Sequence, residues 1–154
     1  MDQFAAAGHD VQLRIAGDGP ERERLSKQIA ASRYSERMEL CGHVFDMNAF
    51  FEQLDVFVLS SLREGLPNVL LEAMAMELPI VATRCGGLAE FVGTSDCVLL
   101  CDPGEPTPLH NLLESVIRST EVRERLSNAA AQHIRRFSFQ ERAKNIAEIY
   151  RRLL

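Results

Sequence analysis

Residues 64–72 read Glu-Gly-Leu-Pro-Asn-Val-Leu-Leu-Glu and follow closely on the apolar run Val56 to Leu59. The apolar run has the length and composition of a buried β-strand, and the residues after it predict a tight loop and then a helix. Gly65 suits a turn or a close backbone approach, and Pro67 suits the first helical turn, where its missing N–H has no partner to lose. This stretch therefore predicts a strand, a loop and a helix N-terminus that carries two carboxylates.

The start of this helix has the features of a phosphate site. The first N–H groups of a helix have no partner within it, and here they belong to the backbone around Asn68 and Val69. Glu64 lies on the loop and Glu72 about two turns into the helix, where carboxylates can accept hydrogen bonds from vicinal hydroxyls. Together these groups suit a sugar-phosphate ligand, whereas for either glutamate alone a solvated surface acid is the favoured interpretation.

Composition indicates a globular protein of one domain. The chain has 154 residues, 46% of them hydrophobic, and a net charge of -5 from 17 basic and 22 acidic residues without a long run of either sign. A general nucleic-acid surface is therefore disfavoured, and any phosphate must be held locally. The N-terminal residues do not resemble a leader peptide, and no apolar run approaches the roughly 18 residues of a membrane span, so we expect a cytoplasmic protein.

The cysteines and histidines do not predict a metal site or a nucleophile. No pair of cysteines forms a C-x-x-C motif, no histidine lies at metal-ligand spacing, and we expect the thiols to act as small hydrophobic groups. We assign no general-base role to the scattered histidines. The residues concerned are Cys41, Cys85, Cys97, Cys101, His9, His43, His110 and His133.

Strand-length apolar runs alternate with helical stretches along the chain. Short continuous apolar strands that each lead into a helix are typical of a parallel sheet covered on both faces, so we predict a doubly wound α/β domain with ligands at the carboxyl ends of the strands. The five predicted strands span Val11 to Ala16, Met38 to Cys41, Val56 to Leu59, Ile80 to Thr83 and Cys97 to Leu100.

The first predicted strand ends in Gly17-Asp18-Gly19-Pro20. Gly19 is expected as the N-cap of the next helix and Pro20 as its first residue. A dinucleotide fingerprint, G-x-G-x-x-G, needs a glycine where Arg22 stands, so NAD binding is disfavoured. Gly17 either contacts a ligand or only makes the turn, and both interpretations stay open.

A terminal helix is predicted at about residues 138–154. Ser138 and Glu141 have the spacing of a capping box, and arginines flank an apolar stripe on the helix that follows. A helix lying on a membrane surface would have such a pattern, but basic residues at a helix end also suit its dipole. We expect this helix to dock on the protein through Ala143, Ile146, Ala147, Tyr150 and Leu153.

Taken in order, these segments resemble the C-terminal, nucleotide-sugar-binding half of a GT-B glycosyltransferase, in the retaining group known as family 4 or group 1. The resemblance covers most of the chain, and the two glutamates of the E-x7-E pattern carry it most specifically. The matching segments are Gly17-Asp18-Gly19-Pro20, Leu40 to Val44, Asp55 to Ser61, Glu64 to Pro67, Glu72 to Ala75, Leu78 to Thr83, Gly86-Gly87 with Glu90, and the closing Phe-Ser helix.

The resemblance assigns roles to individual residues. It implies that Glu64 is the catalytic residue facing the donor sugar and that Glu72 binds the ribose. The loop and helix start, Gly65, Leu66, Pro67, Asn68 and Val69, would hold the diphosphate through their amides.

Further donor contacts are implied elsewhere in the chain. Val44 to Asp46 would lie at the base, although Asp46 also suits a plain helix N-cap. Gly86, Gly87 and Glu90 would lie near the sugar, although a glycine pair also suits a simple turn.

The implied chemistry is transfer of a sugar from a nucleoside diphosphate to an acceptor hydroxyl with retained configuration, in polysaccharide or glycoconjugate biosynthesis. The nucleotide sugar is the substrate, and no cofactor or metal is expected, since the chain has no D-x-D element. Two alternatives stay open: a noncatalytic nucleotide-sugar-binding remnant and a GT-B type sugar-nucleotide epimerase.

The chain departs from the family pattern in two places. Glu77 stands where a small residue, often glycine, is usual at the end of a helix. The Gly-Arg loop and lysine that clamp the diphosphate are not found, so we expect residues 1–154 to be one partial domain without its first strand and without the acceptor-binding N-terminal domain. We therefore expect no turnover by the chain alone, and membrane contact only through the full-length protein.

Overall fold

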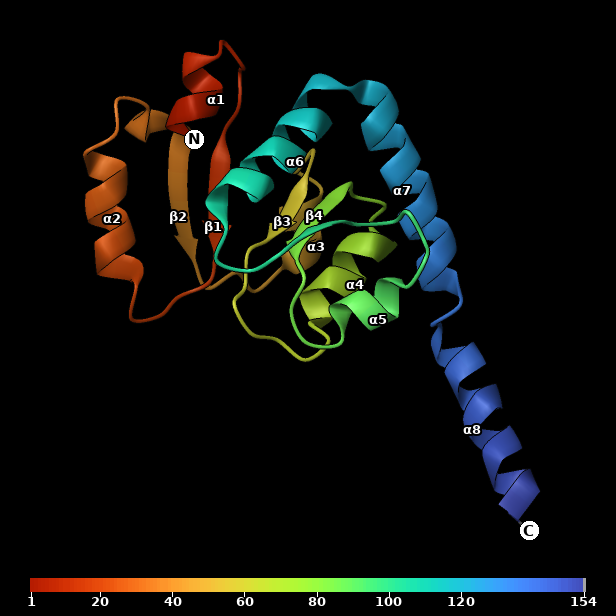
Figure 1. Ribbon diagram of the computed structural model, residues 1–154. Helices are drawn as coiled ribbons and strands as arrows, with labels where there is room; N and C mark the ends of the chain where they lie inside the picture. The colour runs from red at the N-terminus through yellow and green to blue at the C-terminus, as the bar shows by residue number, and fades with distance from the viewer. Residues whose placement is uncertain (154) are drawn as a thin grey trace. The chain divides into compact units, whose positions relative to one another are not determined.

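The computed structural model describes residues 1–153, apart from the side chains of Phe139, Arg142, Asn145 and Leu153. The chain divides into two compact units, Met1–Phe50 and the residues from Phe51 onward. Helices and strands alternate in both units (Figure 1). The elements are α1 (Asp2–Ala6), β1 (Leu13–Ala16), α2 (Arg22–Ala30), a 3-10 turn (Ser35–Arg37), β2 (Met38–Gly42), α3 (Met47–Phe51), β3 (Phe57–Leu59), α4 (Asn68–Ala75), β4 (Ile80–Thr83), α5 (Leu88–Val92), β5 (Leu99–Cys101), α6 (Pro106–Arg118), α7 (Thr120–Arg135) and α8 (Phe139–Leu153).

The first unit contains a parallel pair of strands. Leu13 of β1 lies opposite Met38 of β2, and the register shifts by one residue between Ile15 and Ala16. Helix α2 connects the two strands and packs against β2. This is the strand, helix, parallel strand unit that the sequence predicts.

The second unit is built on a parallel sheet with the order β3-β4-β5. Strand β4 lies in the middle, and its four residues are at most 3% exposed, so both of its faces are buried. Helix α6 packs on β4 and β5, and α7 contacts both α6 and α4. Val81, Val116 and Leu126 are completely buried where α6 and α7 meet the sheet. The predicted α/β class with parallel, covered strands is confirmed.

All five predicted strands are present, but their bounds and connections differ in detail. The last strand begins at Leu99 instead of Cys97, because residues 96–98 form a bend ahead of it. The strands also form two sheets instead of one, β1-β2 and β3-β4-β5.

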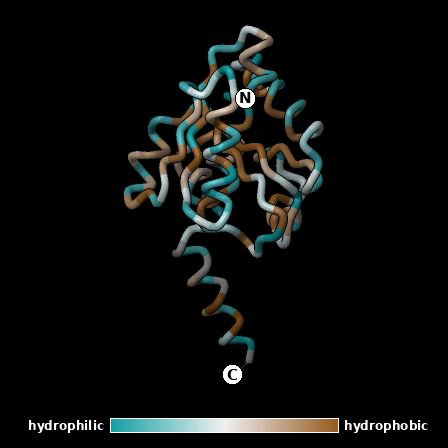
Figure 2. Tube along the Cα trace, turned by 90° about the vertical axis from the view of Figure 1, so that its left-hand side faces the viewer, coloured by the Kyte–Doolittle hydropathy of each residue, from teal (hydrophilic) through white to brown (hydrophobic). Residues whose placement is uncertain are grey.

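The terminal helix α8 begins as predicted, with the amide of Glu141 donating to the Ser138 hydroxyl at 3.3 Å. Hydrophobic and hydrophilic residues alternate along it (Figure 2). The expected docking of its apolar stripe is wrong for the part of the chain described, because Ile146, Ile149 and Tyr150 are 53%, 58% and 64% exposed. Within residues 1–153, no helix has the length and apolar character needed to cross a membrane.

Candidate functional site

The carboxyl edge of the β3-β4-β5 sheet is formed by two neighbouring loops. Strands β3 and β4 run parallel with Leu59 opposite Ala82, so the loops that follow them leave the sheet at the same edge. The loop after β3 carries Glu64 and Gly65, and the loop after β4 carries Gly86 and Gly87. The residues that the sequence predicts for sugar and diphosphate binding in this unit therefore follow adjacent strand ends.

Helix α4 begins at this edge with open amide groups. Pro67 is its N-cap, with ψ of 122°, so the helix starts one residue later than a first-turn position for Pro67 would place it. The amide of Leu70 donates to the carbonyl of Pro67 at 3.1 Å. The amides of Asn68 and Val69 have no acceptor among the described residues, which is the state of a helix end suited to an anion.

Glu64 and Gly65 pack directly against the glycine pair after β4. Gly86 has φ of +53°, and a Cβ built on it would lie 1.7 Å from the main-chain oxygen of Glu64 and 2.7 Å from that of Gly65. The amide of Gly87 donates to the carbonyl of Gly65 at 3.2 Å. The structure thus brings these four predicted site residues together, and it gives the glycine pair a packing role beside any ligand contact.

Two hydroxyl groups that sequence reasoning missed connect this edge to the sheet. The Thr83 hydroxyl, at the end of β4, donates to the carbonyl of Ser61 at 2.5 Å. The Ser61 hydroxyl donates to Oε1 of Glu64 at 2.9 Å. Sequence spacing could have suggested the bond between Ser61 and Glu64, three residues apart, but not the bond between strands.

The carboxylates of Glu64 and Glu72 are both open to solvent. Glu72 is exposed on the second turn of α4, and no described residue forms an ion pair or hydrogen bond with its carboxylate. Glu64 is exposed and has only Ser61 as a side-chain partner among the described residues. Both acids are therefore available to accept hydrogen bonds from ligand hydroxyls.

The glycine loop after β1 forms a turn in the first unit. Gly17 has φ of +113° and its amide donates to the carbonyl of Gly42 at 2.7 Å. The predicted helix start at Gly19 and Pro20 is wrong: α2 begins at Arg22, with Glu21 as its N-cap. The Asp18 carboxylate accepts from the Gly19 amide at 2.8 Å and stabilises the turn ahead of the helix.

The segment predicted to hold the base begins directly after β2. Asp46 accepts from the amide of Ala49 at 3.0 Å, which makes it an N-cap of α3, the plainer of the two interpretations left open. Val44 lies half-buried, and Phe45 is 93% exposed with its ring edge-on to His43. Gly17, Val44 and Asp46 belong to the first unit, so their joint action with Glu64 stays a prediction.

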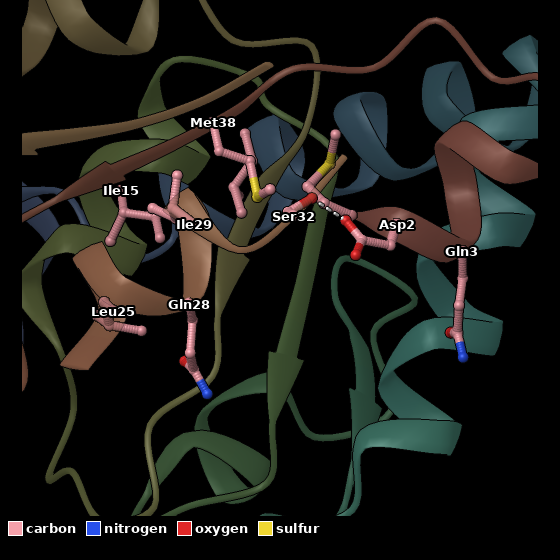
Figure 3. A pocket seen from close by; sticks show the side chains of 10 residues that line it. Asp2, Gln3, Ile15, Leu25, Gln28, Ile29, Ser32 and Met38 are labelled. Carbon is pink, nitrogen blue, oxygen red and sulfur yellow. Dashed lines mark hydrogen bonds between the residues drawn. The ribbon is translucent and has the colours of Figure 1, made fainter. Parts of the chain in front are cut away.

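A hollow of about 370 Å³ lies elsewhere in the first unit, between α1, α2 and the two strands (Figure 3). Its walls include Ile15, Leu25, Ile29 and Met38, and its one hydrogen bond among the drawn side chains joins Ser32 to Asp2. Its lining also includes Asp2, two glutamines and Ser32 but no lysine, arginine or histidine, so no cationic side chain is present to bind a phosphate. We interpret it as space beneath α2 and not as the predicted donor site.

Three of the four cysteines and one of the four histidines are buried. All four cysteines are free thiols, with Cys85, Cys97 and Cys101 buried. Residues 1–153 hold no group of three His, Cys, Asp or Glu side chains that could bind a metal ion. His133 is buried, with Nε2 3.0 Å from the carbonyl oxygen of Phe91.

A family model described as glycosyl transferases group 1 matches residues 1–133. The chain belongs to the group 1 glycosyltransferases. This match confirms the resemblance inferred from the E-x7-E segment and its neighbours.

Individual group 1 relatives show the same relationship. The lipopolysaccharide core biosynthesis glycosyltransferase LpsE of Rhizobium meliloti is 34% identical over 117 residues, covering 76% of this chain and 34% of that protein. The alpha-D-kanosaminyltransferase of Streptomyces kanamyceticus is 30% identical over 156 residues, covering 98% of this chain and 40% of that protein. The chain spans between a third and two fifths of the length of these curated relatives.

Solved structures of glycosyltransferases share the fold. The Anabaena protein HepE in complex with UDP-glucose is 28% identical, with a TM-score of 0.79 over 91% of this chain and 40% of that one. A glycosyltransferase from Rickettsia africae has a TM-score of 0.83 over 98% of this chain and 42% of that one, and at 19% identity this likeness concerns the fold alone.

Proposed function

We propose that this group 1 glycosyltransferase chain binds a nucleoside diphosphate sugar at the carboxyl edge of the β3-β4-β5 sheet. The whole protein that carries it then transfers the sugar to an acceptor hydroxyl with retained configuration. The observation that carries the proposal is the packing of the Glu64-Gly65 loop on Gly86-Gly87, directly ahead of the open amides of α4. Family membership and the complex that HepE forms with UDP-glucose support the choice of ligand.

Each part of this edge has a distinct task in the proposal. The amides of Asn68 and Val69 bind the diphosphate, Glu64 accepts from sugar hydroxyls, and Glu72 accepts from the ribose. When the bond from the sugar C1 to the diphosphate breaks, negative charge grows on the leaving phosphate, while the acceptor oxygen bonds to C1 and its proton passes to the leaving phosphate oxygen. Helix-end amides stabilise that charge without moving a proton themselves, so the step needs no metal ion.

The base-binding part of the proposal uses the first unit. Val44 and Asp46 contact the base through their backbone, and Gly17 lies at the neighbouring strand end. Because Asp46 caps α3 with its side chain, its amide and carbonyl, and not its carboxylate, are the groups assigned to the base.

The expected biological setting is polysaccharide or glycoconjugate assembly, which the relative named for lipopolysaccharide core biosynthesis supports. We propose that the acceptor is bound by another part of the whole protein, as the family resemblance implies. A cytoplasmic location, with peripheral membrane contact through the full-length protein, completes the proposal.

Calorimetry tests the donor assignment. The chain is titrated with UDP-glucose, GDP-mannose and ADP-glucose, and then the tightest of these is titrated into Glu72→Ala. Loss of a hydrogen bond to a charged group is worth about 1.5 kcal/mol or more, so affinity for the nucleotide sugar should fall at least about tenfold. Glu124→Ala is the matched control, because Glu124 is an exposed helical glutamate at the amino edge, beside Asp55 and Pro79.

The result also separates the alternatives. Binding of none of the three probes by the wild-type chain contradicts the proposal. Binding without transfer by the full-length protein identifies the noncatalytic remnant, and conversion of one nucleotide sugar into another identifies the epimerase.

A further inference from the structure

We propose that Ser61 is a positioning residue that aims the carboxylate of Glu64, and that Thr83 in turn fixes Ser61. This inference rests on the proposed donor site, in which Glu64 accepts hydrogen bonds from the sugar. It assigns to Ser61 and Thr83 a task that neither the family match nor the predicted site residues give them.

Thr83 is the fixed end of this chain of hydrogen bonds. It is the last residue of β4, is only 3% exposed, and lies in a strand buried on both faces. Its hydroxyl donates to the carbonyl of Ser61 at 2.5 Å, with the carbonyl of Leu59 at 3.3 Å. Because buried polar groups are nearly always hydrogen-bonded, this bond holds the backbone of Ser61 at the sheet edge after the strand pairing has ended.

Ser61 in turn holds the side chain of Glu64. Its hydroxyl donates to Oε1 of Glu64 at 2.9 Å, which leaves Oε2 and the remaining lone pairs of Oε1 free to accept. Ser61 is half-buried, whereas Glu64 is exposed. A free glutamate side chain loses rotamer freedom when it is fixed. Because Ser61 already holds the carboxylate, part of this entropy cost is incurred before the sugar binds.

The main chain of Glu64 is fixed from the other side. Gly86 packs against its carbonyl oxygen, and Gly87 donates to the next carbonyl, that of Gly65. The glycine pair after β4 thus fixes the backbone of Glu64, and Ser61, held by Thr83 of β4, fixes its carboxylate. Such preorganisation of a ligand-binding group is what a precise sugar site needs.

The test compares a nucleotide sugar with the nucleotide alone. The chain is titrated by calorimetry with the tightest of UDP-glucose, GDP-mannose and ADP-glucose, and with the matching nucleoside diphosphate. Ser61→Ala should lower the affinity for the nucleotide sugar about fivefold to tenfold. The affinity for the nucleoside diphosphate should stay unchanged, because only the sugar contacts Glu64. Ser61→Thr keeps the hydroxyl and should restore most of the affinity, and Ser60→Ala, at an exposed neighbour, is the control.

A double-mutant cycle separates positioning from an independent contact. If Ser61 acts through Glu64, Ser61→Ala added to Glu64→Ala should cause no further loss of nucleotide-sugar affinity. Thr83→Val should reproduce the selective loss, and Thr83→Ser should not.

Several results would overturn the inference. If Ser61→Ala lowered the affinity for both ligands equally, its effect would be a general structural one. If it lowered neither affinity, Ser61 would have no positioning role. Additive losses of affinity in the double variant would make Ser61 a separate contact. In each case a wild-type chain that binds the nucleotide sugar leaves the donor site itself standing. A wild-type chain that binds none of the probes overturns the donor site and this inference together.

Discussion

Gly86 lies so close to the main-chain oxygen of Glu64 that a Cβ at position 86 would be 1.7 Å from it. Its φ of +53° is also a conformation that residues with a side chain adopt at a cost. The loops after β3 and β4 are therefore in tight contact through their backbone atoms, so a shift of one loop requires a shift of the other. The position of Glu64 depends on the residue at 86.

Gly86→Ala should destabilise the chain by at least about 2 kcal/mol, because the added methyl meets a main-chain oxygen and the backbone is held at positive φ. Gly87→Ala is the matched control: its φ is -78° and its Cβ would lie 3.9 Å from the carbonyl oxygen of Gly65. We expect it to change the unfolding free energy by less than about 1 kcal/mol. Urea unfolding of both variants checks this, and equal stabilities would show that the two loops are not tightly fitted.

Glu77 ends helix α4 in a conformation that favours glycine. It has φ of 58°, the amide of Leu78 donates to the carbonyl of Ala73, and its own amide donates to the carbonyl of Met74. This is the paired hydrogen bonding of a helix end that usually carries glycine in the left-handed position.

We expect Glu77→Gly to raise the unfolding free energy by about 1 kcal/mol, since it removes the steric cost of the left-handed conformation. Met76→Gly, one residue earlier with φ of -84°, should instead lower it. Thermal unfolding of the two variants measures the difference. A lower melting temperature for Glu77→Gly would contradict the interpretation.

Burial lowers the pKa of His133, the hydrogen bond with the Phe91 carbonyl raises it less, and the charge of Arg136 lowers it further. Its ring also packs among those of Phe91 and Phe137. The unfolded chain then binds a proton more readily than the folded chain. The stability that His133 contributes should be complete above the ordinary histidine pKa of about 6.5 and fall as the pH drops below it.

His133→Phe removes the titrating group, so it should lose less stability than the wild type between about pH 7.5 and pH 5.5. Urea unfolding at the two pH values gives the comparison. His43→Gln, which changes an exposed histidine, should keep the wild-type dependence. If His133→Phe also kept it, His133 would not be the group responsible.

Donor binding should not depend on a divalent cation. The proposed site neutralises the diphosphate with backbone amides at the start of α4, which EDTA cannot remove. Calorimetric titration with UDP-glucose should give the same affinity with EDTA and with added magnesium. A tenfold loss in EDTA would show that a metal ion takes part.

The sequence predicted the parts of the fold that depend on local pattern. Strand β4 reads as a continuous apolar run because both of its faces are buried, and the capping serine before α8 is visible in the spacing of Ser138 and Glu141. The exposure of Ile146 and Tyr150 was not predictable, because an apolar stripe indicates that a helix can be covered and not what covers it.

The candidate site was predictable only in part. The E-x7-E spacing predicts Glu64 and Glu72 as site residues, and the family resemblance implies that the glycine pair lies near the sugar. The contact of Gly86 with the Glu64 carbonyl and the bond from Thr83 to Ser61 join residues more than twenty positions apart, so they depend on strand pairing. Local chemistry likewise misplaced the start of α2, because the Asp18 side chain stabilises a turn there instead of a helix cap.

The most direct test of the donor site is amide NMR of the chain during titration with UDP-glucose, GDP-mannose and ADP-glucose. The nucleotide sugar that binds should shift the amides of Asn68 and Val69, at the open start of α4. The amide of Val122 should stay unchanged, because the Ser119 side chain already caps the start of α7. Shifts confined to other parts of the chain, or none with any of the three, would contradict the central claim that the start of α4 holds the diphosphate.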